Sequence, residues 1–163
     1  MKSLHCPWRE KYIKRTQNKN IKNDCIFCEK IKENKDEKNY IIFRAKHSVV
    51  ILNLFPYNAG HLLIMPNKHK KDLASISKNT RSEIMELTSK ATTVLEKTLK
   101  CDGINIGINL GEVAGAGIPG HVHIHILPRW NGDTNFMPTL SNTKQISCDM
   151  NRIYKELRKE FCK

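Results

Sequence analysis

The sequence predicts an α+β domain with a mainly antiparallel, five-stranded sheet and two principal helices. Short apolar runs end at turn residues, as at Pro56, Asn58 and Gly60, which is typical of strands joined by tight connections. The two segments with helical spacing of apolar residues lie apart from these strands, one in the middle of the chain and one near its end. Strands paired through turns, with helices grouped elsewhere, favour an antiparallel sheet over a parallel one.

The elements are expected in the following order. Residues 1–24 are a basic, Lys/Asn-rich extension, and residues 25–163 form a single domain. Strands are expected at 40–43, 48–54, 61–65, 104–110 and 121–127. Thr80 and Glu83 have the spacing of a capping box, so a core helix is expected to begin there. A shorter helix is expected at 150–161, with its apolar residues on one side.

Length and composition limit the class of protein. The 163 residues contain 39% hydrophobic residues, enough for one core, and no apolar run approaches the ~20 residues that span a membrane. No apolar segment follows the basic N-terminus as in a secretory signal, so a cytoplasmic location is expected. The net charge of +12 would attract polyanions, but the lysines are spread along the chain. A nucleic-acid partner is therefore not expected.

Three of the seven histidines lie within five residues, at His121, His123 and His125. In a strand these imidazoles would share one face, and Val122 and Ile124 would face the core on the other. Imidazole can act as nucleophile, proton donor or metal ligand, so this pattern indicates a reaction site. A solvated surface strand is the alternative, although Ser, Thr or Lys would serve that purpose equally well.

A glycine-rich loop at residues 111–120 precedes the histidines. Glycines allow backbone N–H groups to approach a phosphate closely. A flexible surface turn would look the same in sequence. Its position directly before the histidines favours a phosphate held where one of them can attack it.

These features together resemble the histidine triad (HIT) superfamily of nucleotide hydrolases and transferases. The resemblance extends to residues 52–66 (LNLFPYNAGHLLIMP), which are similar to an upstream hairpin of the family, and to the strand at 107–111. Residues 7–13 and 128–136 are similar to the diadenosine tetraphosphate phosphorylase branch. The resemblance covers roughly residues 25–130 and implies a homodimer in which the sheet continues from one subunit to the next.

The resemblance also implies roles for individual residues. His123 would be the nucleophile on the α-phosphorus and would form a nucleotidyl-histidine intermediate, with phosphate or water as the second acceptor. His125 would lie at the phosphate oxygens, and His61 would support the site or be structural. Dinucleoside polyphosphates such as diadenosine tetraphosphate are the implied substrates. The implied nucleotide- or phosphate-binding residues are Asn53, Asn109, Gly115, Gly117, Gly120 and His125.

Cys25 and Cys28 form a Cys-x-x-Cys pair. A structural zinc ion needs two further ligands, which spacing alone cannot identify. The resemblance to zinc-containing members implies His69 and His121, so that the first triad histidine would bind metal. The alternative is a pair of buried thiols without a metal.

Other functions remain open at this point. Ile118 stands where nucleoside phosphoramidases usually have serine, which disfavours that activity. Sugar-phosphate nucleotidylyltransferases use a His-Pro-His core in a longer chain, so transfer to a sugar phosphate is also disfavoured. A non-catalytic, zinc-stabilised nucleotide or nucleic-acid binder would explain the cysteines and the charge but not His123. Residues 48–54 with Ile42 and Phe43 are expected to form a base pocket, and Trp130 either stacks on a base or packs in the fold.

Overall fold

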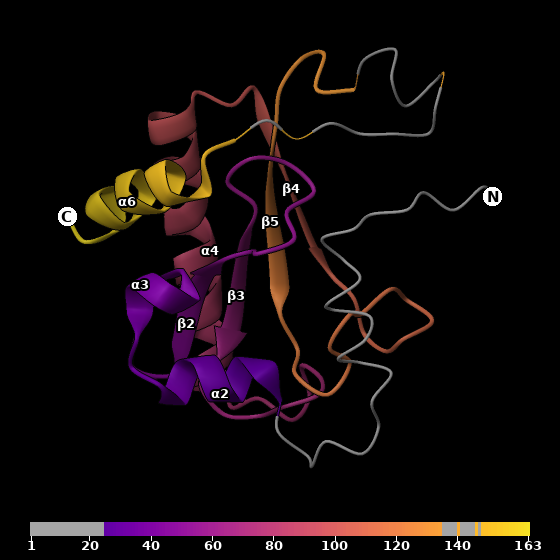
Figure 1. Ribbon diagram of the computed structural model, residues 1–163. Helices are drawn as coiled ribbons and strands as arrows, with labels where there is room; N and C mark the ends of the chain where they lie inside the picture. The colour runs from indigo at the N-terminus through magenta and orange to yellow at the C-terminus, as the bar shows by residue number, and fades with distance from the viewer. Residues whose placement is uncertain (1–24, 135–139, 141–145, 147) are drawn as a thin grey trace.

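The structure is a computed structural model that describes residues 25–134, 140, 146 and 148–163 (Figure 1). The expected extension at 1–24 and the segment 7–13 lie outside the described residues, as do residues 135 and 136. Five strands form one antiparallel sheet in the order β1-β2-β3-β5-β4. They are β1 Ile41–Arg44, β2 Ser48–Leu52, β3 Leu62–Pro66, β4 Gly103–Ile108 and β5 Ile124–Arg129. The predicted α+β class and the five-stranded sheet are confirmed.

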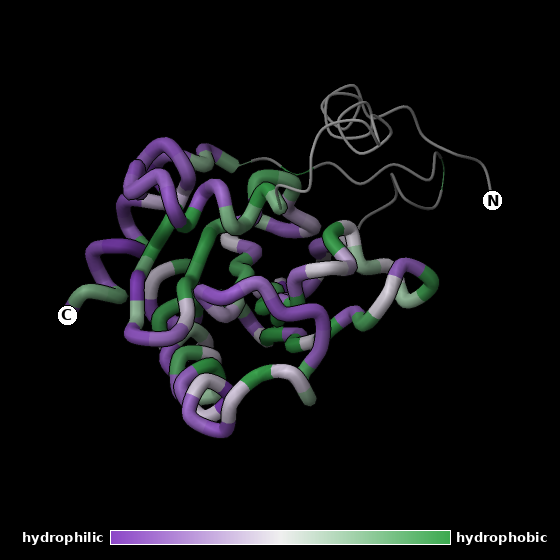
Figure 2. The backbone as a smooth tube through the Cα atoms, turned by 90° about the horizontal axis from the view of Figure 1, so that it is seen from below, coloured by the Kyte–Doolittle hydropathy of each residue, from purple (hydrophilic) through white to green (hydrophobic). Residues whose placement is uncertain are grey.

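Helices cover both faces of the sheet (Figure 1). The long helix α4, Lys78–Leu99, and the C-terminal helix α6, Met150–Phe161, pack against each other and against one face. The short helix α2, Ile26–Lys32, packs Phe27 against the other face, and α3, Asp36–Asn39, precedes β1. Figure 2 shows the apolar residues gathered along the strands and the hydrophilic stretches around the outside.

The residues expected to line a base pocket belong largely to the core. Ile42, Val50 and Leu52 are fully buried in the cluster that contacts α4 and α6, and Phe43 packs against Phe161 of α6. The pocket prediction is therefore wrong for these four residues, because their side chains point to the face covered by α4 and α6.

The start of α4 also differs from the prediction. Ser77 is the N-cap, and its hydroxyl oxygen accepts a hydrogen bond from the Thr80 backbone N–H at 3.2 Å. The carboxylate of Glu83 accepts hydrogen bonds from the His47 backbone N–H and from the Ser48 hydroxyl. Glu83 therefore ties α4 to the start of β2 instead of closing a capping box.

In the part of the chain that the structure describes, no helix is both long enough and apolar enough to span a membrane. α4 is long enough in residues, but charged side chains lie along its exposed side.

Candidate functional site

The three triad histidines do not all lie in a strand. β5 begins at Ile124, so His121 and His123 precede it and only His125 belongs to it. The expected alternation persists, because Val122, Ile124 and Ile126 all lie in the main core cluster. The strand boundary of the prediction is therefore wrong, and the separation of imidazoles from core residues is right. The Val122 backbone N–H donates to the Lys70 carbonyl at 2.7 Å, which fixes this segment before the strand starts.

His123 is held in one tautomer by the backbone. Its Nδ1 lies 2.8 Å from the His121 carbonyl oxygen, which can only accept, so Nδ1 carries the proton. The lone pair of the ring is then on Nε2. Burial lowers the pKa of His123 and so favours the neutral ring, although the hydrogen bond to the His121 carbonyl acts in the opposite direction. The edge of the Phe27 ring packs against the imidazole, with centroids 5.2 Å apart.

A second chain of hydrogen bonds fixes the tautomer of His125. The Tyr57 backbone N–H donates to Nδ1 of His61 at 3.2 Å, so the proton of His61 is on Nε2. That Nε2–H faces Nδ1 of His125 at 2.9 Å, which leaves His125 with its proton on Nε2. Among the described residues, this buried Nε2 has no hydrogen-bond partner. His125 therefore presents an N–H donor that a phosphate oxygen would satisfy.

His61 is a part of the site for which the sequence left two roles open. It is fully buried, and the Asn53 side-chain amide lies 3.1 Å from the same Nδ1 that Tyr57 bonds. Asn53 also accepts from the Phe55 backbone N–H at 3.1 Å. In this structure Asn53, which was expected to bind nucleotide, holds the turn and His61.

The burial of these histidines gives a prediction for stability. Burial first, then the neighbouring His125 and His123, lower the pKa of His61 to about 3, and burial followed by His123 lowers that of His125 to about 4. Below pH ~6.5 the unfolded chain binds protons at these residues and the folded chain does not, so stability falls as the pH falls. When the pH is lowered from about 8 to about 5, each of these two histidines should lower the free energy of unfolding by about 2 kcal/mol.

Urea unfolding at several pH values measures this loss. The matched variant is His61→Gln, which removes one of the two titrating rings and should show a shallower pH dependence than the wild type. Equal slopes for the two proteins would mean that His61 is protonated as readily in the folded state as in the unfolded one.

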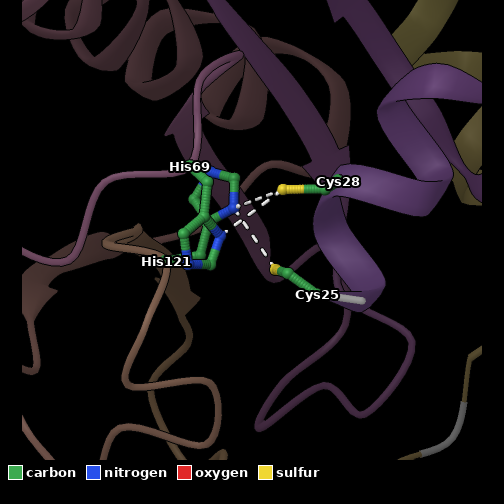
Figure 3. A group of neighbouring side chains, drawn as sticks. All are labelled: Cys25, Cys28, His69 and His121. Atoms are coloured by element: carbon green, nitrogen blue, oxygen red, sulfur yellow. Dashed lines mark hydrogen bonds between the residues drawn. The ribbon is translucent and has the colours of Figure 1, made fainter. Parts of the chain in front are cut away.

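Cys25, Cys28, His69 and His121 form a cluster with the composition of a metal site (Figure 3). The two cysteines lie at the start of α2, and the histidines come from two loops. Their four ligand atoms all lie within 4.8 Å of one another. All four residues predicted from the resemblance are therefore brought together.

The atoms of this cluster fit tetrahedral zinc. Nδ1 of His121 lies 3.4 Å from the Cys25 sulfur and 3.5 Å from the Cys28 sulfur, and Nδ1 of His69 lies 3.5 Å from the Cys28 sulfur. Zinc with ordinary bond lengths places nitrogen and sulfur ligands about 3.5 Å apart. Nε2 of His121 donates to the Pro66 carbonyl at 2.9 Å, so the lone pair of Nδ1 faces the thiols. The residues therefore fit a Cys₂His₂ zinc site.

The glycine-rich loop begins after β4 and ends at His121. Gly115 has a φ of +91°, which favours glycine, and its carbonyl accepts from the Asn109 side-chain amide at 3.3 Å. A Cβ at Gly120 would come within 3.2 Å of Nε2 of His69, so this glycine permits the loop to pass the metal cluster. Gly117 lies between them in the same loop.

Two other residues of interest have structural contacts. The indole N–H of Trp130 donates to the Lys100 carbonyl at 3.2 Å, which favours its packing role. Ile118 packs at the edge of the cluster that contains Phe27. Because the residue is isoleucine, position 118 has no hydroxyl that could act on a substrate.

The family model described as the HIT domain matches residues 34–132. The chain is 34% identical over 151 residues to AP-4-A phosphorylase of Mycobacterium tuberculosis, covering 90% of this chain and 77% of that protein. It is 33% identical over 93 residues to the asymmetrical bis(5'-nucleosyl)-tetraphosphatase of Schizosaccharomyces pombe, covering 57% of this chain and 50% of that protein. The crystal structure of a Zn-bound histidine triad family protein from Mycobacterium smegmatis superposes with a TM-score of 0.70 at 25% identity, covering 85% of this chain and 94% of that one.

Proposed function

The chain belongs to the HIT domain family, and on that premise we propose that it cleaves dinucleoside polyphosphates, such as diadenosine tetraphosphate, by nucleotidyl transfer to His123. One observation carries the proposal. Two adjacent histidines are fixed in complementary tautomers, so that His123 offers a lone pair and His125 an N–H donor. Their ring centroids lie 4.9 Å apart, close enough for both to act on one phosphoryl group.

The first step forms a bond between Nε2 of His123 and the α-phosphorus and breaks the bond from that phosphorus to the bridging oxygen. Nε2–H of His125 donates to the departing oxygen, whose negative charge develops in the transition state. The His123 ring becomes positively charged as it attacks, and its hydrogen bond to the His121 carbonyl stabilises that charge. In the second step an acceptor oxygen attacks the phosphorus, and the bond to His123 breaks.

Backbone N–H groups of the glycine-rich loop are proposed to bind the phosphate oxygens. Asn109 contributes by holding the Gly115 carbonyl, which keeps the loop in a bent conformation. In this assignment Gly117 and Gly120 act through the backbone, and Asn53 acts through His61. Gly115 shapes the loop, because its backbone N–H donates to the Glu112 carbonyl at 2.9 Å.

We propose phosphate as the acceptor, because the similarity to AP-4-A phosphorylase covers a larger share of this chain than the similarity to the tetraphosphatase. The test incubates the protein with diadenosine tetraphosphate, with and without inorganic phosphate. Formation of ADP and ATP that depends on phosphate supports phosphorolysis. Formation of AMP and ATP without dependence on phosphate would mean that water is the acceptor, and the proposed first step would be unchanged.

Cys25, Cys28, His69 and His121 would hold a structural zinc ion. These residues would connect the start of α2, the loop after β3 and the segment that carries the triad through the ion. His121 is then a metal ligand through its side chain and a positioning residue for His123 through its carbonyl.

Residues 25–163 are proposed to act as one domain that pairs with a second copy. Among the described strands, β4 lies at the edge of the sheet and pairs only with β5, and its residue Ile106 is 53% exposed. An open edge with an exposed apolar residue is suited to extending the sheet across a two-fold axis. Sedimentation that gives only an 18.8 kDa species would reject the homodimer.

A further inference from the structure

Tyr57 lies against His125 and His61 and is also open to solvent. Its ring is nearly parallel to that of His125, with an interplanar angle of 17° and centroids 6.1 Å apart. It also packs on His61, with centroids 4.9 Å apart. The residue is nevertheless 50% exposed, and Leu54 in the same turn is 48% exposed. The aromatic surface is therefore available to a ligand at the His125 side of the site.

The two ends of the histidine row carry different aromatic residues. Phe27 is buried and packs its edge against His121 and His123, whereas Tyr57 is half exposed and lies against His125. In the proposed reaction the retained nucleotide is on His123 and the departing oxygen is at His125. The departing nucleotide thus begins next to Tyr57.

The edge of the sheet leaves room beside His125. Gly107 is its direct partner across β4 and β5, so a side chain at Gly107 would lie on the same face. A Cβ there would meet no atom of the described residues within 4 Å. His125 is therefore accessible to a phosphate group from the β4 side.

We propose that Tyr57 is a specificity-determining residue whose exposed ring stacks on the base of the departing nucleotide; this rests on the proposed nucleotidyl transfer through His123. Stacking of a base on an aromatic ring is favourable for any base, because every base has a π face. Tyr57 would then select substrates with a second nucleoside over substrates that end in phosphate.

The experiment compares diadenosine tetraphosphate with adenosine 5'-tetraphosphate, which has the same phosphate chain and lacks the second nucleoside. In Tyr57→Leu, the ratio of kcat/KM for the two substrates should fall about tenfold, the size expected for one stacked base. Tyr57→Phe retains the ring and should retain the ratio. Thermal unfolding of both variants checks that the fold is intact.

The outcomes separate the two proposals. If Tyr57→Leu lowers kcat/KM for both substrates equally, the ring only supports His61 and His125, and the stacking role is rejected. An unchanged kcat/KM for both substrates rejects it as well. If the wild-type protein cleaves neither substrate, nucleotidyl transfer itself fails and the role of Tyr57 fails with it.

Discussion

The His123→Ala variant is expected to lose turnover of diadenosine tetraphosphate by on the order of 10⁴-fold or more, the size typical of removing a covalent nucleophile. No other described nitrogen occupies the same position, because Nε2 of His61 faces His125 and Nδ1 of His121 faces the thiols. The nucleotidyl-protein intermediate should disappear with the imidazole. Steady-state rates, together with an alkaline quench that preserves the phosphorus–nitrogen bond and reveals labelled protein, measure both effects.

His47→Ala is the matched control for this experiment. His47 lies at the turn between β1 and β2, where its backbone N–H binds Glu83, and it takes no part in the histidine row. It should retain the rate and the intermediate. If His123→Ala retained turnover, the covalent mechanism through His123 would be ruled out. A wild-type protein that binds nucleotide with no turnover, and binds it equally in His123→Ala, would instead indicate a non-catalytic binder.

The sequence was most informative where a residue type has few uses. Three imidazoles at alternate positions indicated a reaction site, which stays a prediction. The Cys-x-x-Cys pair, together with the resemblance, indicated the four residues that the structure brings together in one cluster. The spacing could not show that His121 and His123 precede β5, because a strand boundary depends on pairing with β3 and β4. It also could not decide the role of His61, whose ring has hydrogen-bond contacts with Asn53, Tyr57 and His125.

The incorrect predictions have a common physical origin. Ile42, Val50 and Leu52 are apolar in the same way whether they line a pocket or pack under a helix, so composition cannot separate the two cases. Thr80 and Glu83 have the correct spacing for a cap, but Ser77 is also a good N-cap residue and begins the helix earlier. Glu83 was then free to bind the start of β2, a contact between segments that are distant in the chain.

The second large effect is expected on removal of zinc. In Cys28→Ser, the metal content of the purified protein should fall from about one zinc per chain to near zero, and unfolding free energy should fall by about 3 kcal/mol or more. The reason is that Cys28 lies next to both histidine ligands, with its sulfur 3.5 Å from Nδ1 of each. Metal analysis and denaturant unfolding measure the two quantities separately. Cys162→Ser is the control, because Cys162 is exposed at the end of α6 and outside the cluster.

Zinc removal should also affect the rate, although no step uses the metal. The carbonyl of His121 fixes the proton of His123 on Nδ1, and the side chain of the same residue faces the cysteines. Loss of the cross-link frees that backbone, so kcat should fall while the nucleotidyl-protein intermediate still forms. The metal site would be contradicted if purified wild-type protein held less than about 0.2 zinc per chain and Cys28→Ser had the same unfolding free energy as the wild type. The four residues would then be a hydrogen-bonded thiol and imidazole cluster, and His121 would act on His123 through its carbonyl alone.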